Sequence, residues 1–408
     1  MQHFFPTQKD LRFLKVTARR FLFWVHLVGG TTIGLAIFFL AVTGSLMAFQ
    51  TQIVAWAERS ARVRPLAEAV SLPPSALANA ARASQANAMP TNLTFFADKS
   101  RPVEIAFGQK QVLLLDPYSG KVLSAEAGRL RNFFITVRDL HRWLALNGAW
   151  RERARSIKAA CCLLFLLQII TGLVLWIPRQ LSWQHFRAVL WFRGKTRGRV
   201  REWNAHNVAG IWISLPAIAI LLSGLIMAYP WATALLYRAA GTPPPPAVNR
   251  SAGSEDDNAL KQRGSPDADE WKRIDAMTIR AIEQDPKWTS VSFRLPATED
   301  KTVVFTVDEA GSLPAARSRL TLERKTARVV RWEPFSSNPR GRQWRQYARY
   351  IHTGEFLGLP GETIVFSTCL GIMLMVWTGF SLAWRRLAAW RAERESVPAP
   401  PSGVPSIG

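Results

Sequence analysis

Four long apolar stretches divide the sequence, and they constrain its fold more than any other feature. They cover residues 21–49, 157–177, 208–229 and 364–384, and most of the charged residues lie between them. A helix of about 20 apolar residues spans the hydrocarbon core of a bilayer. We therefore expect a membrane protein with four transmembrane helices and both termini on one side, which excludes an ordinary soluble enzyme.

The chain is strongly basic, with 52 Lys and Arg against 29 Asp and Glu. In a soluble protein this excess would favour a nucleic-acid partner, whereas in a membrane protein basic residues flank the spans and meet lipid headgroups. No recognition helix or zinc-finger spacing accompanies the basic residues, so we predict contact with the lipid bilayer and no nucleic-acid partner. The basic residues divide almost evenly between the two faces, and Lys9, Arg12, Lys15, Arg19 and Arg20 before the first span favour cytoplasmic termini.

Two soluble segments, one after the first span and one after the third, repeat the same order of predicted elements. In each, a helical pattern (residues 73–89 and 269–284) precedes strand-like runs with alternating apolar residues. Residues 116–120, Asp-Pro-Tyr-Ser-Gly, predict a turn between two strands of the first segment. A Pro-rich linker of disordered composition precedes the second segment. We therefore expect two small α+β modules.

Four of the six histidines belong to an internal repeat. His26 and His206 share Val at +2, Gly at +4, a hydroxyl residue followed by Gly at +17 and +18, and Met-Ala at +21 and +22. His141 and His352 each follow an Arg at −3 and precede a span that ends in Thr-Gly. A single histidine near a helix end is usually an interfacial side chain, but two related pairs at membrane depth favour a function.

The depth of the histidines predicts which of them pair. The 17 residues from His26 to the +17 position span about 26 Å of helix, so His26 and His206 lie near the cytoplasmic face. His141 and His352 precede their spans on the opposite face, on short segments that end in breaks at residues 147–148 and 358–361. If the two halves pack about a pseudo-twofold axis along the membrane normal, His26 faces His206 and His141 faces His352.

Facing histidines in a transmembrane bundle favour axial ligation of haem iron. Small residues recur beside them at intervals of 14, which suits a slot for a macrocycle but is equally typical of close helix packing. These residues are Gly30, Gly44, Gly210 and Gly224. Arg138, Arg142 and Arg349 lie within one helical turn of the outer histidines and are candidate partners for haem propionates.

A zinc or copper site is a weaker alternative for these histidines. No carboxylate or thiolate accompanies them. Cys161, Cys162 and Cys369 all lie within apolar stretches, which predicts neither a disulfide framework nor a CxxC metal site. We expect these cysteines to be apolar filler.

Several of these motifs resemble the PepSY-associated transmembrane helix family, and within it the inner-membrane ferric-siderophore reductases of the ferrioxamine reductase type. The resemblance covers residues 15–390 and includes HRWL at 141–144, the Thr-Gly span ends and LDPYSGKVL at 115–123. The second half departs from the pattern in two places. It has ERKTA at 323–327 where Asp-Pro and a turn Gly would be expected, and His352 is followed by Thr-Gly rather than Arg-Trp.

The resemblance implies a multi-pass protein of the bacterial inner membrane that binds two haem b groups, with the four paired histidines as axial ligands. Such a reductase passes single electrons to a periplasmic ferric siderophore and releases iron as Fe(II). Its electron donor would be a separate quinol, flavin or reductase, because no GxGxxG motif or flavin domain is evident. A membrane transporter or permease for a siderophore or another small molecule, without redox chemistry, is the alternative. A third possibility is a scaffold whose modules bind a partner.

The predicted fold is membrane α-helical, with four transmembrane helices in two tandem repeats that each enclose a periplasmic PepSY-like module. The repeats give a cytoplasmic N-terminus (1–20), helix 1 (21–49), module 1 (50–137), a His-bearing segment with helix 2 (138–177), a basic cytoplasmic loop (178–205), helix 3 (206–236), a flexible linker (237–267), module 2 (268–348), a second His-bearing segment with helix 4 (349–385) and a cytoplasmic tail (386–408).

Overall fold

The computed structural model divides into two compact units. The membrane unit comprises Met1–Ser45, Ile157–Leu222 and Ile364–Gly408, and the sheet unit comprises Leu46–Ser156 and Ser223–Thr363. The structure describes residues 8–64, 70–85, 88–108, 111–123, 125–144, 146, 150–178, 182–194, 196–245, 266–296, 300–309 and 317–395. Most of the predicted linker and the predicted break at residues 147–148 lie outside these residues.

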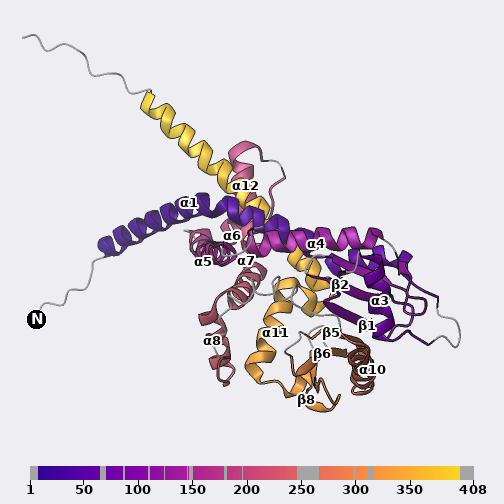
Figure 1. Ribbon diagram of the computed structural model, residues 1–408. Helices are drawn as coiled ribbons and strands as arrows, with labels where there is room; N and C mark the ends of the chain where they lie inside the picture. The colour runs from indigo at the N-terminus through magenta and orange to yellow at the C-terminus, as the bar shows by residue number, and fades with distance from the viewer. Residues whose placement is uncertain are drawn as a thin grey trace, which may run out of the picture. The chain divides into compact units, whose positions relative to one another are not determined.

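Four helices are long and apolar enough to cross a membrane, and the chain is a multi-pass membrane protein (Figure 1). They are α1 (Gln8–Met47), α5 (Trp150–Trp176), α7 (Gly198–Ala228) and α12 (Leu359–Glu395). A short helix, α6 (Trp183–Leu190), lies between α5 and α7. The segment predicted as one helix over 206–236 contains two, because α7 ends at Ala228 and Pro230 begins α8 (Pro230–Ala239).

An apolar cluster joins the four spans inside the membrane unit. It contains Ile33, Ile37 and Ala41 of α1, Ala217 of α7, and Val365, Cys369 and Ile372 of α12, with Cys161 and Phe165 of α5 packed against it. Gly34 lets α1 approach α12, since a Cβ atom there would lie 2.7 Å from the Phe380 ring. At one end of the bundle, Arg19 of α1 donates to the carbonyls of Leu175 and Ile177 at 2.7 and 2.9 Å, and so caps the C-terminal end of α5.

The strands of both predicted modules form one antiparallel sheet of eight strands, in the order β4-β3-β2-β1-β5-β6-β7-β8. The strands are β1 (Asn92–Phe96), β2 (Val103–Phe107), β3 (Gln111–Leu115), β4 (Val122–Leu123), β5 (Trp288–Arg294), β6 (Thr302–Glu309), β7 (Arg317–Glu323) and β8 (Val329–Glu333). β1 pairs with β5, with Leu93 opposite Phe293 and Thr94 opposite Ser292. The modules therefore share a continuous sheet.

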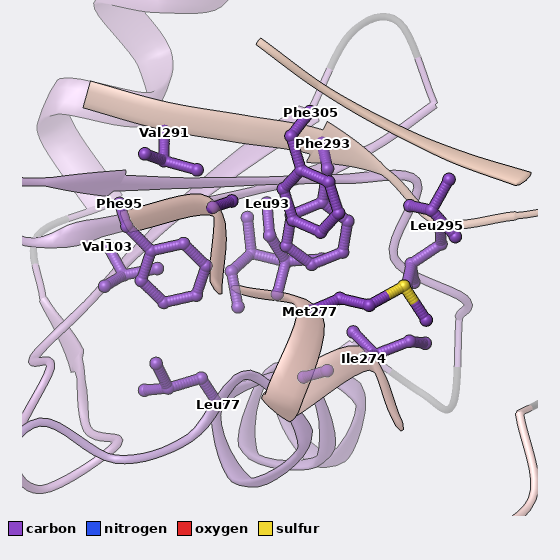
Figure 2. Close-up of a cluster of buried hydrophobic side chains, with 14 of the residues drawn as sticks. Leu77, Leu93, Phe95, Val103, Ile274, Met277, Val291, Phe293, Leu295 and Phe305 are labelled. Carbon is purple, nitrogen blue, oxygen red and sulfur yellow. The ribbon is translucent and has the colours of Figure 1, made fainter. Parts of the chain in front are cut away.

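Two helices cover one face of this sheet and close its core. α3 (Pro74–Ser84) contributes Leu77, and α10 (Ala268–Glu283) contributes Ile274 and Met277, all of which are fully buried. Figure 2 shows these side chains against the inward-facing residues of the strands, among them Leu93 and Phe293. β1 alternates buried and half-buried positions, and residues 290–293 of β5 do the same, as expected for strands with one face against a core.

The two helices are also linked to each other. Asp275 of α10 accepts hydrogen bonds from the main-chain nitrogen of Ser75 in α3 at 2.9 Å and from its hydroxyl at 2.6 Å. The carboxylate thereby satisfies an N–H group in the first turn of α3 that has no partner within the helix. α10 has its own cap, since the Asp267 side chain accepts from the Glu270 main-chain nitrogen at 2.7 Å.

The outer histidines lie on helices that are separate from the spans. α4 (Ala125–Trp143) ends just after His141, and Leu144 adopts a positive φ of 51° before α5 begins at Trp150. α11 (Arg340–Thr353) ends just after His352, at Gly354 with φ 84°. A short 3-10 turn (Glu355–Leu357) and Gly358, with φ 62°, then lead into α12. The second break therefore ends at Gly358, the first residue of the predicted Gly-Leu-Pro-Gly break, and the other three residues of that motif lie in α12.

Candidate functional site

His26 and His206 face each other within the membrane unit. His26 lies on α1 and His206 on α7, and their ring centres are 6.3 Å apart with the ring planes at 87°. The sequence repeat predicts this pair, and the structure brings its members together. We call it the inner pair.

A threonine on the neighbouring span holds each ring of the inner pair. Thr171 of α5 lies 3.0 Å from Nδ1 of His26, and Thr378 of α12 lies 2.9 Å from Nδ1 of His206, measured from the hydroxyl oxygen. Both threonines are 3% exposed. A histidine that ligates a metal through one ring nitrogen usually has its other nitrogen held by a hydrogen bond, which fixes the tautomer and orientation. Here that arrangement leaves Nε2 of each ring to bind.

The glycine after each threonine makes room for the same ring. A Cβ atom on Gly172 would lie 3.1 Å from Cε1 of His26, and one on Gly379 would lie 3.5 Å from Cε1 of His206. Each Thr-Gly dipeptide therefore contributes a hydroxyl to one nitrogen of an imidazole and a bare backbone beside its Cε1 edge.

The spacing of the inner pair fits two imidazoles that share one metal. An imidazole nitrogen lies about 2 Å from a bound metal, and with about 1 Å more to each ring centre the two centres would be about 6 Å apart. Each pair offers two ligands, the number of axial positions on a haem iron, whereas structural zinc takes four protein ligands. Among the described residues, no group of three or more His, Cys, Asp or Glu side chains is placed to hold a metal ion.

The sheet unit contains a second pair with the same spacing. His141 of α4 and His352 of α11 have ring centres 6.3 Å apart and ring planes at 60°. Ser223 of α7 lies 3.4 Å from Nδ1 of His352, and a Cβ atom on Gly224 would lie 3.1 Å from its Cε1. A hydroxyl residue followed by glycine thus adjoins His352 as it does the inner pair. We call His141 and His352 the outer pair.

Three guanidinium groups gather near the outer pair. Partial removal from water lowers the pKa of Arg142, and the positive charges of Arg138 and Arg349 lower it further, against the opposing effect of Asp139. The charges of Arg138 and Arg349 thus both act on Arg142. Such a cluster is suited to an anion with more than one acidic group, and the propionate role of these arginines stays a prediction.

The glycines predicted to line a macrocycle have different neighbours. Gly224 lies against His352. Gly30 faces the side chain of Gln168 of α5 at 3.8 Å, and Gly210 faces Met375 of α12 at 3.2 Å, both measured from an added Cβ atom. Gly44 lies near the C-terminal end of α1. Gly30 and Gly210 therefore each face a side chain of a neighbouring span.

In the sequence, the Thr-Gly and Ser-Gly dipeptides are recognisable only as markers of the repeat. The structure shows that Thr171, Thr378 and Ser223 contact the histidines directly. Their recurrence at matching places in both halves was the available signal, because polar residues inside spans are costly and usually have a partner.

These features define a four-span membrane protein that carries two pairs of facing histidines and a shared β-sheet. A family model described as the PepSY-associated TM region matches residues 23–386, and the chain belongs to this family. No curated protein matches the sequence at a significant level.

Proposed function

We propose that this protein is a di-haem b-type reductase of the bacterial inner membrane that passes single electrons across the membrane to a periplasmic ferric siderophore. His26 and His206 would hold one haem, and His141 and His352 the other. When bound, haem b would supply one-electron chemistry. The donor would be a quinol, a flavin or a reductase, and the product Fe(II), which hard oxygen ligands bind less tightly than Fe(III).

The observation that carries this proposal is the equal spacing of the two histidine pairs. Both have ring centres 6.3 Å apart, although they lie in different units and on different kinds of helix. In the inner pair the hydroxyls that hold the rings also match, with Thr171 and Thr378 on Nδ1. Two independent sites with the same spacing favour a shared ligand requirement over incidental packing.

The other residues near the pairs have roles that follow from their chemistry. The threonine hydroxyls would keep the imidazoles in one tautomer and one orientation. Arg138, Arg142 and Arg349 would neutralise propionates at the outer pair through charge-assisted hydrogen bonds. The apolar cluster around α1, α5, α7 and α12 would exclude water from the path between donor and acceptor.

Matching contacts in the two halves also support two tandem repeats with an outer, periplasmic sheet unit. His26 and Thr171 of the first half correspond to His206 and Thr378 of the second. The sheet order places β1–β4 and β5–β8 as mirrored sets about the β1–β5 contact. Cytoplasmic termini would put the outer pair on the periplasmic side, where a ferric chelate arrives.

An optical spectrum of the purified protein tests the proposal directly. We expect a Soret band and a dithionite-induced α band. His206→Ala and His141→Ala should each remove about half of the haem, because each variant destroys one pair. His185→Ala on α6 is the control and should keep the full amount. Absence of haem from the wild type would remove the reductase assignment and favour a transporter or a scaffold.

Electron transfer to iron needs its own measurement. The dithionite-reduced protein, freed of excess dithionite, should be reoxidised when a ferric chelate is added, and a ferrous trap should record an equal amount of Fe(II). Ferric hydroxamate, catecholate and carboxylate chelates would be compared. Haem that stays reduced with every chelate would contradict ferric reduction while leaving haem binding intact.

A further inference from the structure

A cavity of about 480 Å³ lies within the sheet unit, outside the two histidine pairs. α2 (Gln50–Ala57), the 3-10 turn Glu58–Ala61 and α4 form its walls together with the chain at β2 and β3. Its lining residues are Gln50, Thr51, Val54, Ala55, Glu58, Arg62, Arg101, Pro102, Val112, Arg131, Ile135 and Arg138. Four of these are arginines and one is acidic.

The acidic residue is already paired inside the protein. Glu58, 7% exposed, accepts a hydrogen bond from Arg131, whose guanidinium also binds Glu104 at 2.7 and 3.1 Å. Glu104 itself is not among the lining residues. Arg131 therefore has a structural role, because it neutralises two carboxylates that burial would otherwise make costly.

The remaining arginines are available to a ligand. Arg62 lies 3.6 Å from Asp98, with 56% of its side chain exposed, and Arg101 lies 3.6 Å from Glu104. The Arg62 pair is exposed and contributes little to stability, so its guanidinium can turn to another anion at small cost. The Arg101 guanidinium lies 3.5 Å from the centre of the Phe96 ring, which holds it at the edge of the cavity. Val54, Val112 and Ile135 add apolar wall between the charged groups.

The cavity is a feature of the first half and not a consequence of the helix arrangement. In the second half, α8 follows the span α7 as α2 follows α1, and α11 carries His352 as α4 carries His141. There the helices pack closely, because Tyr237 of α8 is 7% exposed and a Cβ atom on Gly341 of α11 would lie 2.5 Å from its ring. The cavity described above lies at the arginine-bearing pair, α2 and α4.

We propose that this cavity binds a small anionic ferric chelate of the polycarboxylate class, held by Arg62 and Arg101, with Arg138 between the chelate and the outer pair. Arg138 precedes His141 by three residues on α4, so the two share a helix face. The volume is at the lower end of the range for small-molecule sites, about 300–1,000 Å³, which favours a compact chelate.

This assignment rests on the proposed reductase and names its substrate. One electron from the donor of that reductase converts bound Fe(III) to Fe(II), while the carboxylate groups keep their charge. The chelate gains one negative charge and its metal–oxygen bonds weaken, so iron leaves as Fe(II) and the polycarboxylate dissociates unchanged. No proton or covalent bond has to be transferred.

Binding of gallium(III) citrate, measured by titration calorimetry, tests the site without redox chemistry. The full-length protein would be used in nanodiscs of zwitterionic lipid. We expect Arg62→Ala with Arg101→Ala to weaken binding at least tenfold and added salt to weaken wild-type binding. Arg59→Ala is the control, since Arg59 is exposed on the 3-10 turn Glu58–Ala61 beside the cavity but does not line the cavity. An unchanged affinity in the double variant, or no binding to the wild type, would overturn the proposal.

Two further arms separate this site from its alternatives. Loss of gallium citrate binding when anionic lipid replaces zwitterionic lipid would assign the cavity to a lipid headgroup, against the proposal. In reduction assays the double variant should raise KM for ferric citrate and leave haem content and the reduction of a cationic hydroxamate chelate unchanged. If the protein lacks haem but binds gallium citrate through these arginines, the proposed reductase function is contradicted and the proposed chelate-binding site is supported.

Discussion

At the residue scale, the structure shows how a polar side chain inside a span fixes the orientation of a histidine. Thr171 and Thr378 are almost fully buried, and each places its hydroxyl on Nδ1 of an inner-pair ring. Each hydroxyl also contacts a carbonyl of its own helix, Gln168 for Thr171 and Leu374 for Thr378. The hydroxyl is therefore satisfied on both sides, and its loss would remove the side-chain anchor of the imidazole.

Thr171→Val removes this anchor and keeps the side-chain shape. If the inner pair holds haem, we expect a competing haem-binding agent to remove the inner haem at a 10- to 100-fold lower concentration. This is the usual loss of affinity when a group that orients a metal ligand is removed. The reduction potential of the inner haem should also shift. Redox titration and haem content measure both effects. Thr32→Val on α1 is the control, because the Thr32 hydroxyl contacts only Val28 of its own helix among the described contacts. Equal behaviour of the two variants would contradict the anchoring role.

Gly172 and Gly379 occupy matching positions but differ in the space they leave. An alanine Cβ would lie 3.1 Å from the His26 ring at residue 172 and 3.5 Å from the His206 ring at residue 379. Alanine favours a helix over glycine by about 1 kcal/mol. We expect Gly379→Ala to leave the melting temperature unchanged or to raise it. Gly172→Ala should give a lower melting temperature than Gly379→Ala, because the His26 ring must move to make room for the new methyl group.

Thermal unfolding of both variants in the same detergent measures the difference between these glycines. The inner-pair spectrum should change for Gly172→Ala alone. A Gly172→Ala variant that is as stable as Gly379→Ala would contradict the close contact with His26.

At the element scale, the turn after β7 keeps the geometry of its counterpart without the expected turn residues. Residues 116–120 of the first module form a turn in which Gly120 has φ 70° and donates to the Asp116 carbonyl at 2.9 Å. In the second module Ala327 has φ 55° and donates to the Glu323 carbonyl at the same distance. The departure at ERKTA therefore changes the residues and leaves the turn unchanged.

Ala327 is accordingly a site where glycine should stabilise the protein. A left-handed conformation costs an L-residue about 1–2 kcal/mol, and glycine avoids this cost but loses more chain entropy on folding. We expect Ala327→Gly to raise the free energy of unfolding by about 0.5–1 kcal/mol and Gly120→Ala to lower it by about 1 kcal/mol. Denaturant unfolding followed by tryptophan fluorescence measures both, and effects of equal sign would contradict the shared geometry.

At the scale of the whole molecule, the shared sheet joins two segments that are far apart in sequence. β1 and β5 are neighbours, with Thr94 directly opposite Ser292. Opposite residues of an antiparallel pair have Cα atoms about 4.5–5.5 Å apart, within the range of a disulfide. Residue 306 lies on β6, beyond β5, and is therefore about two strand spacings, or about 10 Å, from β1.

Thr94→Cys with Ser292→Cys should form a disulfide under mild oxidation when Cys161, Cys162 and Cys369 are replaced by alanine. Thr94→Cys with Thr306→Cys is the matched control and should not form one. Mass spectrometry of peptides from the unreduced protein identifies the link. Cross-linking of the control pair, or of neither pair, would contradict the β1–β5 contact.

The features that could be predicted from sequence are those set by local pattern. The apolar stretches predict spans because a bilayer requires about 20 apolar residues in a helix. Alternating residues predict strands, and a repeat of histidines with their neighbours predicts the pairs His26–His206 and His141–His352. Gly358 of the Gly-Leu-Pro-Gly motif lies in the break before α12, as backbone preferences predict.

Other features depend on contacts between distant parts of the chain. The Thr171 hydroxyl on His26, the arginine-lined cavity and the β1–β5 pairing each join residues from separate segments, and no local pattern encodes such a partner. An edge strand can pair with any compatible edge, so the sharing of one sheet by the two modules emerges only in the folded chain. Local pattern therefore accounts for the spans and the histidine pairs, whereas long-range packing accounts for what holds the histidines and what lies beside them.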